Sequence, residues 1–216
     1  MQLDKQDVAW VLRRCPDVVC KILMEHPGKL FLAGGFIRSC ISKEPINDVD
    51  LFCGSKEFAL GVAGSLYQKI KDASVIDTDN ALTVLGEKLP IQFIHRWVFE
   101  TPQQCIESFD FTVASAAIWH NGEAWESVCD ERYYADLAAK RLTYRNPIRE
   151  EEAGGSMLRV LKFARQGYTI PIDDLSAVME RVVDSLSSEH GATKREQIRF
   201  RLREVDPLFD PYHLGH

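Results

Sequence analysis

The sequence predicts an α+β protein, in which a small mixed sheet with its helices forms a head and a short helical neck follows it. Short apolar runs separated by turn residues fill the first two thirds of the chain and are typical of strands and short helices. From about Arg132 the apolar residues instead recur with the period of a helix. This change of period separates a sheet-containing head from a helical C-terminal part.

Length and composition fit this prediction. The chain has 216 residues, enough for one sizeable domain or one domain with a small helical appendage. Hydrophobic residues make up 45% of the chain and charged residues 27%, as in ordinary soluble globular proteins. The formal net charge of −6 argues against a protein that coats nucleic acid, although it is compatible with a local basic patch.

Targeting signals and cysteine pairs are both missing from the sequence. No stretch is long and apolar enough to cross a bilayer, and the first residues lack the basic and apolar regions of a signal peptide. We therefore expect a cytoplasmic protein without a membrane partner. The six cysteines are scattered without a C-x-x-C pair, which predicts neither disulfides nor a zinc site. The sequence does not indicate the oligomeric state.

The N-terminal region is predicted to lead into an anion-binding turn. Residues 4–25 have the apolar spacing of two short helices broken at Pro16, and residues 30–33 form an apolar run typical of a buried strand. Gly34 and Gly35 then permit a tight turn into a helix over residues 36–42. The N-terminus of that helix favours phosphate, because its unpaired N–H groups and its dipole both attract anions.

The middle of the chain alternates between strands and short helices. Residues 48–52 are a predicted strand, and Ser55 is the predicted cap of a helix that runs to about Ile70. Thr101 opens a short helix, and Asn121 with Gly122 predicts a hairpin turn. Further strands are predicted at residues 74–76, 81–85, 90–94, 111–119 and 124–128.

The C-terminal part is predicted to be helical, and the loop at residues 145–155, with its proline and glycines, marks the boundary. Three parts follow: N-terminal helices over residues 1–28, a head over 29–145 and a helical neck over 146–216. In the neck, the apolar spacing predicts a buried helix face made by Met157, Val160, Leu161 and Ala164.

Asp48 and Asp50 are the leading candidates for a functional site. They lie one residue apart on a predicted strand, so their side chains share a face while Val49 turns toward the core. Two adjacent carboxylates repel each other unless divalent cations lie between them, and hard oxygen ligands suit Mg²⁺ or Mn²⁺. A solvated strand end with two chance acidic residues is the alternative.

The glycine pair and the aspartate pair together resemble a known signature. Gly34-Gly35-Phe36-Ile37-Arg38 followed by Asp48-Val49-Asp50 is similar to the G-G-x-V-R-D and D-x-D motifs of class II CCA-adding enzymes and bacterial poly(A) polymerases. These enzymes belong to the DNA polymerase β-like nucleotidyltransferase superfamily. Residues 109–113 (FDFTV) resemble the family's R-D-F-T-x-N-A segment, and residues 158–168 resemble its helix after the catalytic head. The resemblance covers roughly residues 30 to 170.

The resemblance implies a role for each motif. Asp48, Asp50 and Asp110 are the implied catalytic carboxylates, which bind two Mg²⁺ or Mn²⁺ ions that clamp the attacking and leaving oxygens. The implied nucleotide is an NTP, most often ATP or CTP. The implied nucleotide-binding residues are those of the glycine turn and the helix after it, namely Gly34, Gly35, Arg38 and Ser39.

Departures from the family pattern limit what the resemblance implies. Ser39 stands where the family has aspartate, which puts ribose or phosphate contacts at that place in doubt. The family's base-reading E-D-x-x-R element falls on Glu152, Ala153 and Ser156, so a protein-templated choice of CTP and then ATP is not expected. Gln92 lies on a strand where many superfamily members carry their third carboxylate. The chain also ends near where the family's tRNA-gripping domains would begin, so we expect no complete CCA-adding cycle.

The sequence therefore predicts a metal-dependent nucleotidyltransferase that moves a nucleoside monophosphate from an NTP to an acceptor hydroxyl. An RNA 3′ end is the first acceptor that the family suggests, and a hydroxyl on a protein or a small molecule, as in nucleotidylating toxins, is the second. The alternative of a different class is a catalytically silent nucleotide-binding or interaction module. The intact aspartate pair favours the enzyme, whereas Ser39 and Gln92 favour the silent module.

Several candidate residues also have ordinary structural explanations. Arg38 can pair with a surface carboxylate instead of a phosphate, and Asp110, between two phenylalanines, can have a capping or structural role at the start of a strand. The cluster of His95, Arg96 and Trp97 is typical of a strand edge as well as of a base contact.

The last predicted helix carries a row of arginines. The row fits an RNA backbone contact, but its interleaved glutamates also fit an ordinary solvated helix face. The arginines recur every four residues, at Arg195, Arg199 and Arg203.

Overall fold

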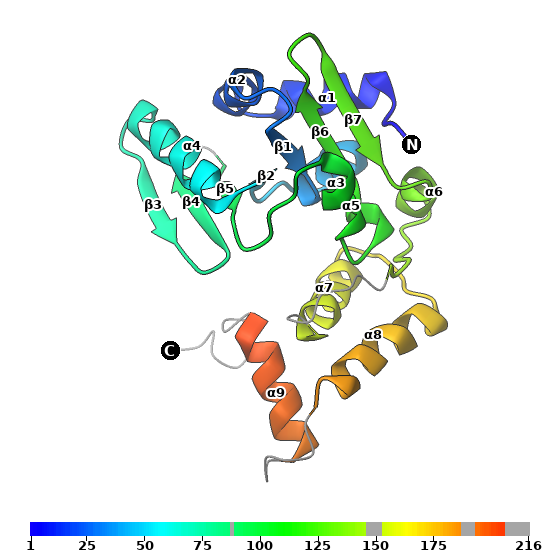
Figure 1. Cartoon of the computed structure of the whole chain (residues 1–216). Coiled ribbons are helices and arrows are strands. Elements are labelled where there is room, and N and C mark those ends of the chain that lie inside the picture. Colours follow the sequence, from blue (N-terminus) through cyan, green and yellow to red (C-terminus); the bar gives the residue numbers. More distant parts are fainter. Residues whose placement is uncertain (87–88, 146–152, 187–192, 206–216) are drawn as a thin grey trace. The chain divides into compact units, whose positions relative to one another are not determined.

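The chain folds into two compact units, Met1–Ala138 and Ala139–His216. The structure is a computed structural model, and it describes residues 1–86, 89–145, 153–186 and 193–205. The first unit holds a seven-stranded sheet with helices packed on it, and the described part of the second is mainly helical (Figure 1). The α+β class predicted from the sequence is therefore confirmed. The finer division at residues 28 and 145 remains a prediction.

The sheet has the strand order β3-β4-β5-β2-β1-β6-β7. Every neighbouring pair is antiparallel except β2 and β5, which run parallel. The interior strand β1 is buried along its whole length, whereas the edge strand β3 is exposed along its whole length. The strands span Leu30–Ala33 (β1), Val49–Cys53 (β2), Ser74–Asp77 (β3), Ala81–Leu85 (β4), Ile91–Ile94 (β5), Ala116–His120 (β6) and Trp125–Cys129 (β7).

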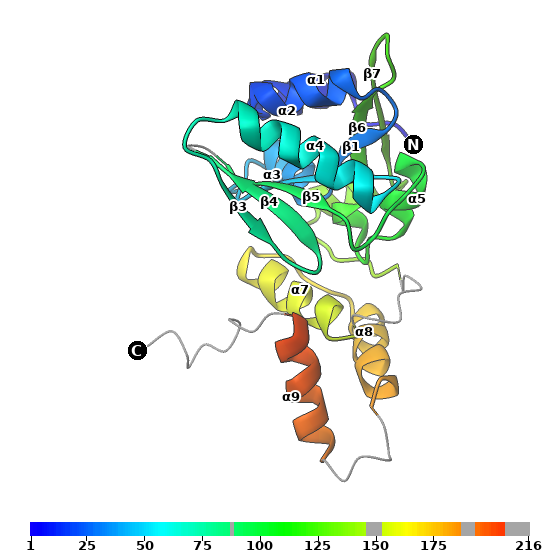
Figure 2. The same cartoon turned by 60° about the vertical axis from the view of Figure 1, so that its left-hand side comes forward.

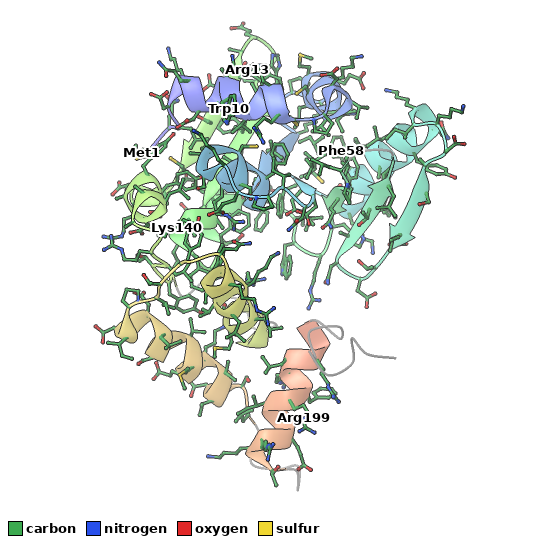
Figure 3. The ribbon with its side chains drawn as sticks, turned by 180° about the vertical axis from the view of Figure 1, so that it is seen from behind. Met1, Trp10, Arg13, Phe58, Lys140 and Arg199 are labelled. Atoms are coloured by element: carbon green, nitrogen blue, oxygen red, sulfur yellow. The ribbon has the colours of Figure 1, made fainter. Side chains whose placement is uncertain are left out.

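The helices of the first unit pack on different strands of the sheet (Figure 2). Helix α4 contacts β2, β5 and β4, while α5 contacts β1, β6 and β7. Helix α1 packs on α3, where the Trp10 indole N–H donates to the carbonyl of Cys40 at 3.0 Å (Figure 3). The helices span Lys5–Arg14 (α1), Asp17–Glu25 (α2), Gly35–Ser42 (α3), Lys56–Lys69 (α4), Pro102–Glu107 (α5) and Tyr133–Ala138 (α6), with a 3₁₀ turn at Thr112–Ala114 (η1).

Alternation along the strands gives the sheet two different faces. On one face an apolar cluster joins the sheet to α5, and Ile94 and Phe109 pack against this cluster. The alternate strand residues, such as Val49 and Leu51 of β2, lie on the opposite face of the sheet and are fully buried. The apolar cluster consists of Phe31, Ala33, Phe52, Cys105, Ile106 and Ala117.

Local signals in the sequence set most of the element boundaries. The Ser55 hydroxyl accepts a hydrogen bond from the N–H of Phe58 at 3.1 Å, which confirms the predicted cap of α4. Thr101 and Gln104 form a reciprocal capping box at the start of α5. Asn121 and Gly122 make the turn between β6 and β7, where Gly122 has a φ of 109°.

The single long strand predicted over residues 111–119 is wrong. The segment instead forms η1 and then β6, because one local and one long-range side-chain hydrogen bond replace the ladder at its start. The Thr112 hydroxyl donates to the buried carboxylate of Asp136 at 2.7 Å, and the Ser115 hydroxyl donates to the carbonyl of Phe111 at 3.1 Å.

The second unit contains α7 (Ala153–Arg165), α8 (Ile172–Asp184) and α9 (Lys194–Val205), with α7 in contact with both of the others. The loop predicted up to residue 155 ends too late, because α7 already begins at Ala153. A β-carbon placed on Gly154 would lie 2.9 Å from the carbonyl oxygen of Arg201. The glycine therefore permits the close approach of α7 and α9.

The buried face predicted for α7 is wrong in part. Leu161 is 38% exposed and Ala164 is also exposed, whereas Leu158 and Phe163 are buried. The apolar spacing predicted the helix correctly, but it placed the buried face around Leu161 and Ala164 instead of around Leu158 and Phe163.

No helix in the described parts of the chain combines the length and the hydropathy needed to cross a membrane.

Gly34 occupies a backbone position that other residues rarely adopt. It precedes α3 with a φ of 82° and a ψ of −133°, and its N–H donates to the carbonyl of Ala116 at 3.0 Å. A β-carbon at this position would lie 3.3 Å from Cζ of Phe109. Glycine is therefore required here both by conformation and by packing.

We expect Gly34→Ala to lower the free energy of unfolding by about 1–3 kcal/mol, because alanine is strained at this φ and crowds Phe109. Chemical denaturation monitored by circular dichroism measures this change. Gly61→Ala is the matched control, since Gly61 lies exposed in α4 with no atom near its β-carbon position. That control is expected to gain up to about 1 kcal/mol. Equal effects at the two positions would contradict the explanation.

Candidate nucleotide and metal site

The ring of Phe109 brings the three sequence motifs together. Its Cζ lies 3.3 Å from the position of a β-carbon on Gly34, and its ring centroid lies 5.8 Å from that of Phe52 in an edge-on arrangement. Gly34 belongs to the glycine turn, Phe52 follows Asp50 on β2, and Phe109 precedes Asp110. Segments far apart in the sequence therefore meet beside one apolar cluster.

The aspartate pair lies where β2 begins. Asp48 immediately precedes the strand and Asp50 is its second residue, and both are half-buried. Val49 between them is fully buried. This burial pattern is the one expected if the two carboxylates share a face of the strand.

Asp110 lies in the segment just before η1 and is 4% exposed. Within the residues that the structure describes, no group of three His, Cys, Asp or Glu side chains is arranged to hold a metal ion. The complete ligand set of Asp48, Asp50 and Asp110 therefore remains a prediction. Asp48 and Asp50 alone still offer the donor chemistry of magnesium sites, which commonly use one or two carboxylates together with phosphates and waters.

Gly35 leaves open space at the start of α3. It is the first helical residue and is half-buried, and no atom lies within 4 Å of the position that a β-carbon would occupy. The N–H groups of the first helical turn have no partners within the helix, so this end of α3 can accept an anion. The absence of a side chain would let a phosphate approach the backbone closely.

Arg38 forms an ion pair within the protein. It is 8% exposed, its Nε lies 3.3 Å from Oε2 of Glu44, and its Nη2 donates to the Ser39 hydroxyl at 3.2 Å. Lys43 ends α3 with a φ of 56°, and the N–H of Glu44 then donates to the carbonyl of Ser39 at 2.9 Å. This left-handed turn folds Glu44 back beside the arginine, and nothing in the sequence pattern had pointed to Glu44.

The His95, Arg96 and Trp97 cluster lies away from the aspartate pair. It follows β5, and since β5 runs parallel to β2 it lies at the end where β2 finishes. Arg96 donates to the Asn80 side chain at 2.7 Å and its guanidinium lies 5.2 Å from the ring centroid of Trp97. These contacts lie at the end of β5, which is an interior strand, and they give the cluster a structural role within the protein.

The cysteines next to the site are not poised as nucleophiles. Cys40 and Cys53 are both fully buried. Burial raises the pKa of the Cys40 thiol to about 11, and it also raises the pKa of the Cys53 thiol. Both groups therefore stay protonated at neutral pH.

A buried hydrogen-bond network supports the segment that carries Asp110. The Asp136 carboxylate is fully buried, accepts from Thr112 at 2.7 Å and accepts twice from the Arg132 guanidinium at 3.2 Å. Sequence analysis missed this network, because no local pattern connects Thr112 to a carboxylate 24 positions later.

The remaining candidate residues lie in the second unit. Glu152 lies outside the described residues, and Ser156 is 2% exposed within α7. Arg195 and Arg199 are exposed on α9, where Arg199 is labelled in Figure 3.

Comparison with known proteins identifies the family. The sequence profile of the Gabija anti-defense 2 family matches residues 2–140. The chain belongs to this family. A relative named Gabija anti-defense 2, from Bacillus phage SPbetaL7, is 28% identical over 182 residues, which are 83% of this chain and 44% of the relative. The chain thus spans less than half the length of this family member.

Solved structures identify the fold. The Thermotoga maritima CCA-adding enzyme complexed with tRNA superimposes with a TM-score of 0.61 at 13% identity, over 92% of this chain and 49% of the enzyme. A tRNA nucleotidyltransferase complexed with a primer tRNA and an incoming ATP analog gives 0.57 at 20% identity, over 86% of this chain and 58% of that one. The nucleotidyltransferase fold implied by the sequence motifs is confirmed, and identities this low show the fold alone.

Removing the Thr112 hydroxyl should loosen the segment that carries Asp110. We expect Thr112→Val to lower the free energy of unfolding by about 1.5–3 kcal/mol, because the buried Asp136 carboxylate loses a short hydrogen bond. Chemical denaturation measures the loss. Thr112→Ser keeps the hydroxyl and serves as the control, with a clearly smaller expected loss. If serine and valine destabilise equally, the hydrogen bond is not the cause.

Proposed function

We propose that this protein is a metal-dependent nucleotidyltransferase that moves a nucleoside monophosphate from an NTP to an acceptor hydroxyl. The observation that carries the proposal is the meeting of three segments around Phe109: the glycine turn, the strand β2 that carries Asp50 and the segment before η1. A nucleotidyltransferase fold with this pair of carboxylates beside an open helix N-terminus has both a place for phosphate and a place for cations.

Asp48 and Asp50 are the proposed ligands for Mg²⁺ or Mn²⁺, and Asp110 is the proposed third catalytic carboxylate. Divalent cations, when bound, lower the pKa of the acceptor hydroxyl and offset the charge of the departing pyrophosphate. Asp48 and Asp50 contribute fixed negative charge on one face of a buried strand, so the geometry is set before the nucleotide arrives. Such preorganised positioning supplies most of the rate in phosphoryl transfer.

The glycine turn is the proposed cradle for the triphosphate. Gly34 is the proposed turn residue of this cradle, and its own N–H already donates to the carbonyl of Ala116. The backbone amides from Gly35 onward, at the N-terminus of α3, would face the phosphate oxygens. Arg38 and Ser39, one turn later on α3, complete the proposed contacts. The Arg38 guanidinium is bound to Glu44 in this structure, so direct contact with phosphate would require this ion pair to rearrange.

ATP or CTP is the proposed nucleotide, because solved structures of the same fold contain these nucleotides. An RNA 3′ end is the first proposed acceptor, since other structures of this fold contain tRNA. The exposed arginines of α9 are a proposed contact for such an RNA. A hydroxyl on a protein is the second acceptor to test, because the family is described by its action against a defence and not by an RNA substrate.

The proposed biological role follows the family description. The relative from a Bacillus phage carries the name Gabija anti-defense 2. We propose that this chain also counteracts the Gabija defence and that nucleotidyl transfer is the chemistry by which it does so.

Replacing the aspartates with isosteric amides tests the chemistry directly. We expect Asp48→Asn and Asp50→Asn each to reduce label transfer from α-labelled NTPs by roughly 10³-fold or more, because the cation site loses its charge. Purified protein is incubated with each NTP, Mg²⁺ or Mn²⁺, and either total RNA or a cell extract from a Gabija-carrying host. Asp173→Asn, an exposed aspartate of α8, is the matched control and should keep full transfer.

The same variants separate an enzyme from a silent module. Phage plating is compared on hosts with and without the Gabija defence that express wild-type protein or the Asp48→Asn, Asp50→Asn double variant. If the folded double variant no longer restores phage plating on the host that carries the defence, catalysis is supported. If that variant restores plating fully and the wild type shows no label transfer, the protein is the silent module instead.

Gly35→Ala tests the phosphate cradle without disturbing the fold. We expect stability to be unchanged or higher by up to about 1 kcal/mol, because the new methyl group meets no protein atom and alanine favours the helix. We also expect Mg-ATP affinity to fall roughly tenfold, about 1.4 kcal/mol, because the methyl group enters the space proposed for phosphate. Calorimetric titration measures both this variant and Gly61→Ala. Unchanged ATP affinity would remove the cradle from the proposal.

A further inference from the structure

A row of polar side chains crosses three neighbouring strands beside the aspartate pair. Asp50 of β2 is directly opposite Gln92 of β5, and Gln92 is directly opposite Thr83 of β4. All three are half-buried. The flanking residues of β5, Ile91 and Phe93, are buried. Neighbouring strands lie about 4.8 Å apart, so the paired residues Asp50, Gln92 and Thr83 form a continuous row.

Packing shows which face of the sheet carries the row. Phe52, two residues beyond Asp50, belongs to the apolar cluster under α5, and Ile94, two residues beyond Gln92, packs against that cluster. Residues two apart on a strand share a face, so Asp50 and Gln92 share the face of that cluster. The row therefore lies next to the apolar cluster, on its side toward the start of β2, which Asp48 immediately precedes.

We propose that Gln92 supplies a neutral oxygen ligand to the cation site next to Asp50. This inference rests on the proposed function, because it concerns the same site. An amide carbonyl is a hard oxygen donor that suits Mg²⁺ or Mn²⁺, and the paired position of Gln92 places it beside Asp50. The charge of the site then comes from the proposed aspartates, while Gln92 adds a ligand without adding repulsion.

The neutral ligand has a consequence for the order of binding. With a neutral ligand at position 92 in place of a carboxylate, the site attracts a free divalent cation less strongly, since affinity for such ions follows the number of charged ligands. The triphosphate then contributes the remaining oxygens, so cation and nucleotide bind together. The residue that departs from the superfamily pattern would thus make cation binding depend on the nucleotide.

Changing the charge at position 92 tests the inference. Binding of Mn²⁺ alone, without nucleotide, is measured from the electron paramagnetic resonance signal of the free ion. We expect Gln92→Glu to tighten Mn²⁺ binding roughly tenfold, because a further carboxylate joins the site, and Gln92→Leu to weaken it. Gln68→Glu makes the same charge change on the exposed surface of α4 and should leave binding unchanged.

The outcomes separate this inference from the proposed function. If Asp50→Asn loses Mn²⁺ but Gln92→Glu behaves like Gln68→Glu, then Gln92 does not face the cation and only this inference is overturned. If Mn²⁺ binding is also unaffected by Asp48→Asn and Asp50→Asn, the proposed cation site itself is overturned. Circular dichroism confirms that each variant is folded. If glutamate at position 92 prevents folding, Gln92→Leu still tests the inference, because it is expected to weaken Mn²⁺ binding.

Discussion

The packing of Phe109 against Gly34 is the contact on which the site depends. The ring fills the space that a β-carbon at Gly34 would need, and its edge meets the face of Phe52. Phe52 in turn stacks on Phe31 of the interior strand β1, with ring centroids 6.5 Å apart. The glycine turn, the start of β2 and the segment before η1 are thus fixed to one apolar base. Because close-packed interiors resist deformation, this base can hold polar groups in place above it.

The family and the fold together suggest how this protein can act. Its family is described by action against a bacterial defence, whereas its fold is shared with enzymes that extend tRNA. Folds host many activities, so the argument for catalysis rests on the site and not on the fold. The half-exposed aspartates, the buried valine between them and the unobstructed glycine turn are retained in this chain. The E-D-x-x-R element, which reads the base in the family that the motifs resemble, is not retained in this chain.

Much of the fold could be predicted because its signals are local. The helix break at Pro16, the Ser55 cap, the hairpin at Asn121 and Gly122 and the strand pattern all follow from neighbours in the sequence. The same holds for the glycine turn and the spacing of Asp48 and Asp50. The strand wrongly extended back to residue 111 shows the limit of such signals, since its start is diverted by a carboxylate from a later helix.

The rest of the site could not be predicted because it depends on contacts between distant segments. Glu44 was missed because only the left-handed turn at Lys43 brings it to Arg38. Phe109 was noticed only as part of a motif, since its contact with Gly34 joins residues 75 positions apart. Asp110 shared a motif with the family, yet its burial depends on how the chain packs around η1. These contacts cannot be predicted from the periodicity of the sequence, because each depends on how the chain folds between the two residues.

The left-handed turn at Lys43 has an electrostatic consequence for the glycine turn. By returning Glu44 to Arg38, it cancels the only full positive charge within α3, so this helix presents its backbone dipole to an incoming anion and almost no side-chain field. A triphosphate that arrives at this turn therefore meets backbone amide groups first, and the guanidinium can join them only after Glu44 has released it. The ion pair is thus a contact that nucleotide binding would have to reverse before Arg38 could take part.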